Sequence, residues 1–390
     1  MKPTPRPLFG PEHEAFREQA RRFCEREIAP QHAAWEEAHG VPREVWQRAG
    51  AAGLLGCWLP EAQGGHGGDL LFDMIVAEEL GRIGATGPGF ALHSVIVMPY
   101  LTAHATPTLQ RALLPAMVRG EKIGAIAMTE PGAGSDLAGM RTQARRVSSA
   151  DGDHYILSGQ KTFITNGHNA DVIVVACKTD AAQGAHGVSL LVVTEGMVGF
   201  TRGRNLRKIG QHAQDTAELF FDHVRVPADH LLGDEGRGFK YLMQKLPQER
   251  LLISVQCQAR AEAAFDWTVQ YVQERQAFKQ RLADFQNTRF KLGTLAADLA
   301  AGRAYCDQLL ARHLAGELDA AEAAAGKLWH SELLGRVTDE CLQLFGGYGY
   351  MHEYPIARAW SDARIERIYG GTSEIMKEII ARELLDARAR

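Results

Sequence analysis

The chain has 390 residues, of which 45% are hydrophobic and 23% charged, and its formal net charge is −4. Nucleic-acid binders need clustered cations to neutralise phosphates, so this balance argues against that class. No apolar run approaches the ~18–20 residues that a membrane span requires. The length predicts two or three domains. The N-terminal stretch resembles neither a signal peptide nor a transit peptide, so we expect a cytoplasmic protein of bacterial origin.

The cysteines favour neither a metal site nor a disulfide framework. The chain has six of them, and no CxxC pair occurs. Metal ligands usually come in close Cys/His pairs, and disulfide frameworks are typical of short secreted chains. We therefore expect reduced cysteines that fill the core, and no bound metal.

The first third of the chain predicts helices. Phe16, Ala20, Phe23 and Ile28 recur at helical spacing, and Pro30 ends the run. Helical patterns return in 43–54 and 70–84, on either side of a glycine-rich loop at 59–69.

Beyond Ile126 the hydrophobic period shifts toward 2, and from Phe239 onward it becomes helical again. The alternating segments are 153–159, 171–178, 188–194 and 217–227. The later amphipathic runs are 241–273, 289–316, 320–344 and 373–388. The chain thus predicts an α+β protein with an N-terminal all-α domain (1–126), a central antiparallel β domain (127–236) and a C-terminal four-helix bundle (237–390).

The glycine clusters do not form a nicotinamide-type dinucleotide site. No strand–helix–strand alternation is present, and in the cluster that starts at Gly132 the sixth position is Leu137. The run that starts at Gly347 ends at His352 instead of a glycine. The GxGxxG fingerprint requires both the third glycine and the strand–helix context.

Two segments around the start of the β domain could hold a flat or anionic ligand. Glycines in 127–136 leave backbone N–H groups accessible, but an ordinary turn explains them equally well, and Glu130 could be a surface charge. In 159–167, Phe163 and Thr165 could pack on and hydrogen-bond a ring such as isoalloxazine, or be ordinary strand residues.

The bundle carries two further candidates. Pro247 should fix or kink the start of a helix, which would put Glu249 in or near its first turn; the helix dipole alone would also explain a glutamate there. Thr372 or Ser373 is a good N-cap for the last helix, whose N-terminus could then face a phosphate.

Taken together, these motifs resemble the acyl-CoA dehydrogenase family over essentially the whole chain. The matching segments, in family order and spacing, are 127–136, 159–167, 207–227, 274–278, 344–350 and 368–375. The segments 246–252, 343–357 and 368–383 are most similar to the long-chain branch.

The resemblance implies a fold of the three predicted domains, with FAD between the β domain and the bundle and partly against a neighbouring subunit. The implied FAD-binding residues near the flavin are Ile126, Met128, Thr129, Gly134, Ser135, Phe163 and Thr165. Those implied for a neighbouring subunit's FAD are Arg275, Phe278, Gln286, Gln343, Gly346 and Gly347, and Thr372 and Glu374 complete the set. Lys279 departs from the family pattern, which commonly has glycine after the phenylalanine.

The family reaction removes an α-proton and a β-hydride from an acyl-CoA thioester. The commonest family pattern has its catalytic glutamate where this chain has Gly370. The long-chain and isovaleryl branches instead place it directly before an arginine in the bundle's first helix, as in Glu249–Arg250. The resemblance therefore implies Glu249 as the base and the Gly370 N–H as a donor to the thioester oxygen.

The remaining expectations concern substrate and partners. The implied substrate-binding residues are Ser135, Pro247, Gln248, Arg250, Tyr369, Gly370 and Gly371. We expect a medium-chain, long-chain or branched acyl-CoA as substrate, electron-transfer flavoprotein as the electron acceptor, and a homotetramer. An acyl-CoA oxidase and a non-catalytic acyl-CoA- or FAD-binding paralogue are the alternatives.

Overall fold

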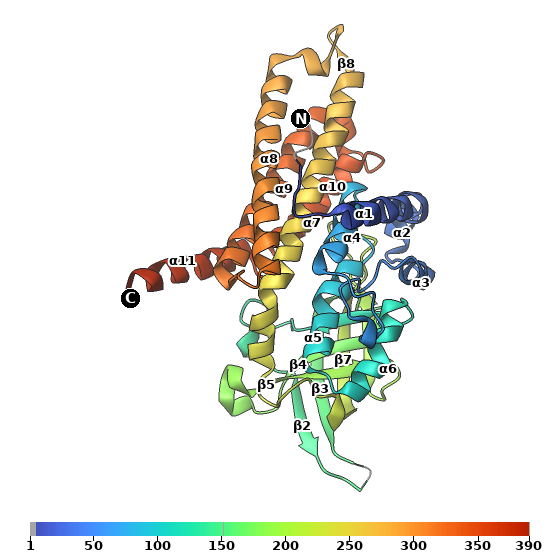
Figure 1. The fold of residues 1–390 in the computed structure, drawn as a ribbon, viewed down its shortest axis with the longest axis vertical. Helices are drawn as coiled ribbons and strands as arrows, with labels where there is room; N and C mark the ends of the chain where they lie inside the picture. The colour runs from blue at the N-terminus through green and yellow to red at the C-terminus, as the bar shows by residue number, and fades with distance from the viewer. Residues whose placement is uncertain (1–4, 151, 390) are drawn as a thin grey trace.

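The computed structural model describes residues 5–150 and 152–389. Its N-terminal part is helical, as predicted (Figure 1). The helices are α1 (Pro11–Phe23), α2 (His32–Ala38), α3 (Arg43–Ala51), α4 (Leu70–Arg82), α5 (Met98–His104) and α6 (Pro107–Val118). Two π-helical segments, η1 (Cys24–Ile28) and η3 (Leu92–Val97), continue into or out of them, and η2 (Glu61–Gln63) is a short 3₁₀ turn.

Seven strands of the described chain form one sheet, in the order β1-β4-β2-β3-β7-β6, with β5 also paired to β4. They are β1 (Gly124–Ala127), β2 (Gln143–Val147), β3 (His154–Thr165), β4 (Val172–Lys178), β5 (Val188–Thr194), β6 (Phe200–Asn205) and β7 (Thr216–Pro227). Short 3₁₀ segments η4 (Leu137–Gly139), η5 (Ala181–Gly187) and η6 (Ala228–His230) link them or follow them.

The sheet confirms the predicted β domain, with one correction to its topology. The pairs β2–β3, β3–β7, β4–β5 and β6–β7 are antiparallel. β1, however, lies parallel to β4, with Gly124 opposite Val172, and β2 meets β4 in parallel at a single pair. The sheet is therefore mixed. Strand periodicity reports which face is buried and says nothing about the direction of the neighbouring strand.

Long helices make up the C-terminal part, as predicted. They are α7 (Gly238–Glu274), α8 (Gln286–Leu314), α9 (Ala320–Phe345), α10 (Pro355–Ala363) and α11 (Ser373–Ala389). The hairpin β8 (Gln276–Ala277) and β9 (Gln280–Arg281), followed by η7 (Leu282–Asp284), joins α7 to α8, and η8 (Gly346–Tyr350) and η9 (Arg364–Arg367) flank α10. Figure 1 shows α7 running from the sheet to this hairpin at the opposite end of the molecule, and α11 pointing away from the body.

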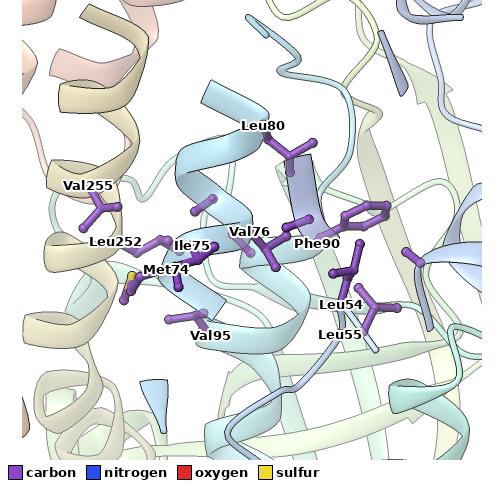
Figure 2. Packing of buried hydrophobic residues seen from close by; sticks show 14 of the residues in the cluster. Leu54, Leu55, Met74, Ile75, Val76, Leu80, Phe90, Val95, Leu252 and Val255 are labelled. Atoms are coloured by element: carbon purple, nitrogen blue, oxygen red, sulfur yellow. The ribbon is translucent and has the colours of Figure 1, made fainter. Parts of the chain in front are cut away.

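The hydrophobic core is continuous between the N-terminal helices and the bundle. Figure 2 shows Met74 and Ile75 of α4 beside Leu252 and Val255 of α7. Gly81 allows this contact, because a Cβ at that position would come within 2.8 Å of the Ala259 Cβ. α7 therefore packs against the N-terminal helices as well as against the other helices of the bundle. The expected domain boundaries, after residues 126 and 236, stay predictions; the first falls within β1 and the second lies just before α7.

The prediction that the cysteines fill the core is confirmed. All six cysteines are free and buried, in the helical cores or in β4. No group of metal-ligating side chains within residues 5–150 and 152–389 is arranged to hold a metal ion. Of the helices described, none is both long enough and apolar enough to cross a membrane.

Candidate active site

A cavity of about 450 Å³ lies where the N-terminal helices, the sheet and α7 meet. It brings together twelve of the residues expected to bind cofactor or substrate or to act in catalysis: Ile126, Met128, Thr129, Gly134, Ser135, Phe163, Thr165, Glu249, Arg250, Tyr369, Gly370 and Gly371. These come from four separate segments of the chain. The sequence motifs are thus parts of one site.

A β-bulge places Phe163 on the wall of this cavity. The register of β3 against β7 shifts between Lys161 and Ile164, so the bulged strand carries one extra residue there. Phe163 has φ +60°, an unusual conformation for a bulky side chain, and is 66% exposed, while Ile164 stays buried. The bulge thus points the Phe163 ring into the cavity. In a regular strand this ring would pack in the core or lie in solvent.

The loop that contains Thr129 and Ser135 is anchored by a buried ion pair. Glu130 accepts hydrogen bonds from the N–H groups of Arg141 (2.6 Å) and Thr142 (3.0 Å) and from Lys161 Nζ (2.8 Å). Burial would raise the pKa of Glu130, but these donors hold that pKa below its ordinary value. Lys161 Nζ also donates to the Met128 carbonyl at 2.9 Å. Glu130 is therefore a structural anchor and not a surface charge.

Glu249 lies in the interior of α7, so the expectation of a first-turn position was wrong. α7 begins at Gly238, about three turns before Glu249, and continues through Pro247. Proline lacks the N–H that would bond to the carbonyl four residues earlier, so α7 forgoes one bond there. Packing of this long helix against α4 and α9 stabilises it past the proline, which a local helix-start signal does not capture.

Burial changes the acidity of Glu249. Its side chain is 5% exposed, and Tyr100 of α5 donates a 2.9 Å hydrogen bond to Oε1. Burial raises the pKa of Glu249 to about 7, against the opposing effects of the Tyr100 hydrogen bond and the Arg250 charge. A carboxyl with this pKa can take up a proton near neutral pH.

The Gly370–Gly371 turn sits beside Glu249 and has a conformation that favours glycine. Their φ values are +64° and +98°, and a Cβ on Gly370 would lie 2.5 Å from the Ile253 Cδ1. The buried Lys327 of α9 donates to the Gly371 carbonyl at 2.6 Å. No described residue accepts a hydrogen bond from the Gly370 N–H. The turn can therefore offer that N–H to a ligand.

Two other acidic side chains near the cavity, Glu366 and Asp362, have structural partners. Glu366 is fully buried and pairs with Arg260 at 2.5 Å. Asp362 accepts from Thr86 Oγ1 at 2.8 Å and from the Gln211 N–H. Arg260 and Gln211 line the cavity, as do Leu92 and Ile96, and the sequence reasoning missed all four. These four residues can be assigned to the cavity only from their contacts in the folded chain.

A second group of expected cofactor residues lies at the far end of α7. Arg275 is over the Tyr348 ring, 5.2 Å from its centroid, and Phe278 is 90% exposed. Gln286 begins α8, and Gln343, Gly346 and Gly347 lie at the end of α9 and the start of η8. None of these six lines the cavity. At ~1.5 Å per residue, Arg275 is roughly 39 Å along the helix from Glu249.

The remaining expected residues lie outside the cavity lining. Thr372 is the N-cap of α11, where its Oγ1 accepts from the Ile375 N–H at 3.3 Å, and Glu374 lies in the first turn. Gln248 donates to the Val95 carbonyl at 2.7 Å and lines a separate cavity, and Pro247 lines neither. Pro247 and Gln248 are therefore outside the main cavity lining, and their expected contact with substrate stays a prediction.

The cavity residues fit a bound FAD. An aromatic side chain is held exposed on one wall, and Thr129, Ser135 and Thr165 supply hydroxyl groups around it. A Cβ on Gly134 would meet no atom within 4 Å, so open space adjoins the loop backbone. A flat apolar ring with polar edges needs this combination of aromatic contact and nearby hydrogen-bonding groups.

Comparison with known proteins supports the same conclusion. Residues 10–121, 125–224 and 236–385 match the N-terminal, middle and C-terminal domains of acyl-CoA dehydrogenases. The chain is 51% identical to a mitochondrial long-chain specific acyl-CoA dehydrogenase of Sus scrofa, over 97% of this chain and 88% of that protein.

Solved structures give the same result. An acyl-CoA dehydrogenase from Geobacillus kaustophilus superimposes with a TM-score of 0.94 and 47% identity, covering 97% of this chain and all of that one. An acyl-CoA dehydrogenase from Bacillus anthracis, solved with FAD, has a TM-score of 0.89 and 31% identity over 98% of this chain and 68% of that one. From its motifs, its fold, its cavity and these relatives, the chain belongs to the acyl-CoA dehydrogenase family.

Proposed function

We propose that Glu249 is the base in the FAD-dependent α,β-dehydrogenation of acyl-CoA thioesters, the reaction of this family. The observation that carries this assignment is the burial of the Glu249 carboxyl in the cavity wall, one turn from Ile253 and beside the glycine turn at 370. Gly370 cannot supply a carboxylate, and the acidic neighbours Glu366 and Asp362 are already paired.

In this proposal, different residues of the chain remove the proton and stabilise the negative charge that develops on the thioester. Glu249 takes the α-proton onto its carboxylate, and the Gly370 N–H donates to the thioester oxygen, which becomes more negative as the proton leaves. Arg250 lies next to the base and stays charged, although burial lowers its pKa. Burial leaves the Glu249 carboxylate less solvated and therefore more basic.

FAD, when bound, supplies the acceptor for the β-hydride. Phe163, Thr129 and Thr165 would hold its ring from the sheet side, and Ser135 would lie toward the phosphates and CoA. Ile126, Met128, Gly134, Thr372 and Glu374 are proposed as further contacts, and Tyr369 and Gly371 as substrate contacts.

Anaerobic reduction of the bound flavin by acyl-CoA tests the role of Glu249. Glu249→Gln should keep its FAD absorbance and lose about 10²–10⁴-fold in the rate of flavin bleaching, the range for removing a general base. Glu262→Gln is the matched control, because Glu262 lies on the same helix but pairs with Arg303 outside the cavity. Bleaching at the wild-type rate would remove Glu249 from the role.

For the substrate we propose medium-chain to long-chain acyl-CoA. The support is an apolar lining that continues from Glu249 onto α4 and η3, through Leu80, Leu92 and Ile96, together with the identity to a long-chain specific relative. Flavin bleaching by palmitoyl-CoA and octanoyl-CoA should be faster than by butyryl-CoA or isovaleryl-CoA. The reverse order would point to short or branched substrates.

We propose further that electron-transfer flavoprotein accepts the electrons and that the protein is a homotetramer. The support for sharing FAD between subunits is the distance of Arg275, Phe278, Gln286, Gln343, Gly346 and Gly347 from the cavity. Reoxidation by electron-transfer flavoprotein without hydrogen peroxide release would separate this function from that of an oxidase, and sedimentation would give the subunit number. A cytoplasmic location stays a prediction from the sequence.

A further inference from the structure

Tyr100 is the described side chain that donates a hydrogen bond to the Glu249 carboxyl. Its side chain is fully buried, and its O–H donates to Oε1 at 2.9 Å. Oε2 has no donor among the described residues. Tyr100 belongs to the N-terminal helices and Glu249 to the bundle, so this bond joins two parts of the protein through the base itself.

The local backbone explains how an α5 residue reaches α7. The π-helical segment η3 directly precedes α5, and Pro99 follows in its first turn. A π-helical turn changes the angular phase of the residues after it, and such turns often occur at functional sites. Leu92 and Ile96 of η3 face the main cavity, whereas Pro99 and Thr102 line the second one. Tyr100 lines neither cavity, and its hydroxyl reaches the Glu249 carboxyl.

A buried phenol in an apolar environment needs a hydrogen-bond partner. Tyr100 belongs to a buried apolar cluster that also contains Val97, Met98 and Leu242, and a phenylalanine would fill the same place in it. The hydroxyl would cost free energy in this environment without its bond to Glu249, so the bond is what distinguishes tyrosine from phenylalanine here.

We propose that Tyr100 is a positioning residue for the reaction: its O–H holds one carboxylate oxygen of Glu249 and leaves the other for the α-proton of the acyl thioester. This inference rests on the proposed role of Glu249. A carboxylate fixed through one oxygen does not have to reorient during proton removal, which lowers the barrier.

The same bond sets the pH at which the base is ionised. The groups that act on the Glu249 carboxyl are Tyr100 from α5 and Arg250 from α7, and both favour its charged form. From α9, the Lys327 amine is held by the Gly371 carbonyl. Removing the Tyr100 donor leaves burial less opposed, so the pKa of Glu249 rises.

Tyr100→Phe tests the proposal in the FAD-loaded protein. The readout is the anaerobic flavin-reduction rate with palmitoyl-CoA from about pH 5 to about pH 9, the range in which a carboxyl with a raised pKa titrates. We expect a rate about 10-fold lower near pH 7, and a midpoint of the acidic limb about half a unit to one unit higher. α-Deuterated substrate should also show a larger isotope effect. Tyr155→Phe, which removes a hydroxyl bonded to Glu235 in the β domain, should change none of these.

Each outcome decides between roles. A lower melting temperature with an unmoved midpoint and isotope effect would show a merely structural tyrosine and overturn the proposal, as would wild-type behaviour. If Tyr100→Phe does not retain FAD, difluorotyrosine at position 100 replaces it. This stronger donor should lower the midpoint, and an unchanged midpoint would again overturn the proposal. Glu249→Gln separates the two ideas: if it still reduces flavin, the base assignment fails regardless of Tyr100.

Discussion

The two ends of α7 carry groups of very different character. Near the sheet, Glu249 is 5% exposed in a cavity whose walls all come from this chain. At the hairpin end, Phe278 is 90% exposed and the Arg275 guanidinium lies over the ring of Tyr348. The first region is buried, and burial tunes its carboxyl, whereas the second presents exposed groups. One helix thus serves a site of its own and, in our proposal, the cofactor of a neighbour.

The largest expected effect comes from moving the carboxylate within the cavity. Gly370→Glu in a Glu249→Gln background should restore flavin bleaching at least about 10-fold, because the added carboxylate is again a general base beside the substrate. The Cβ would meet Ile253, so Ile253→Ala should be included. Gly370→Gln in the same background is the control. Equal rates for the two would show that position 370 cannot present a base in this chain.

The next effect concerns stability and its dependence on pH. Glu249 has a folded pKa of about 7, above its unfolded value, so the native state binds more protons between these values. The free energy of unfolding therefore falls as pH rises from about 4.5 through about 7, by up to roughly 3 kcal/mol.

Glu249→Gln should remove this decrease, so that the variant is more stable than wild type at about pH 8 by roughly 1–3 kcal/mol. Urea unfolding at about pH 5 and about pH 8 measures the difference. The same variant of Glu262 serves as the control. If the free energy of unfolding changes with pH in the same way for wild type and Glu249→Gln, burial does not raise the pKa of Glu249 and the prediction fails.

A smaller effect is expected at the hairpin end. Arg275→Ala should weaken FAD retention by about 10-fold, through loss of a charged contact, without moving the pH midpoint of flavin reduction. Arg281→Ala, on the same hairpin but paired with Asp284, is the control. Measurement of bound FAD after gel filtration decides the point. If Arg275→Ala shifts the pH midpoint of flavin reduction, the two ends of α7 do not act independently.

The smallest effect is at Lys279. Phe278 and Lys279 have φ values of +53° and +67° in the two-residue turn between β8 and β9, a conformation that favours glycine at the second position. Lys279→Gly should raise the free energy of unfolding by about 0.5–1 kcal/mol. Lys279→Ala keeps the strain and should give no gain, so equal melting temperatures for the two variants would contradict the explanation.

The sequence by itself determined the order of helices and strands, the family, and twelve of the residues around the cavity. These features depend on local periodicity and on motifs of a few residues, which can be recognised without knowledge of distant contacts. It also singled out Glu249 and Gly370. Position 370 lacks the glutamate of the commonest family pattern, and Glu249 matches the glutamate of the long-chain and isovaleryl pattern.

Only the tertiary structure decided where those residues lie and what surrounds them. Glu249 is inside a 37-residue helix and not at its start, Pro247 and Gln248 lie outside the main cavity lining, and β1 pairs in parallel. Tyr100 and the Lys161–Glu130 pair gave no local signal, because their partners are 149 and 31 residues away in the chain. Burial, hydrogen bonding and the resulting pKa depend on these long-range contacts, and packing of the whole chain sets them.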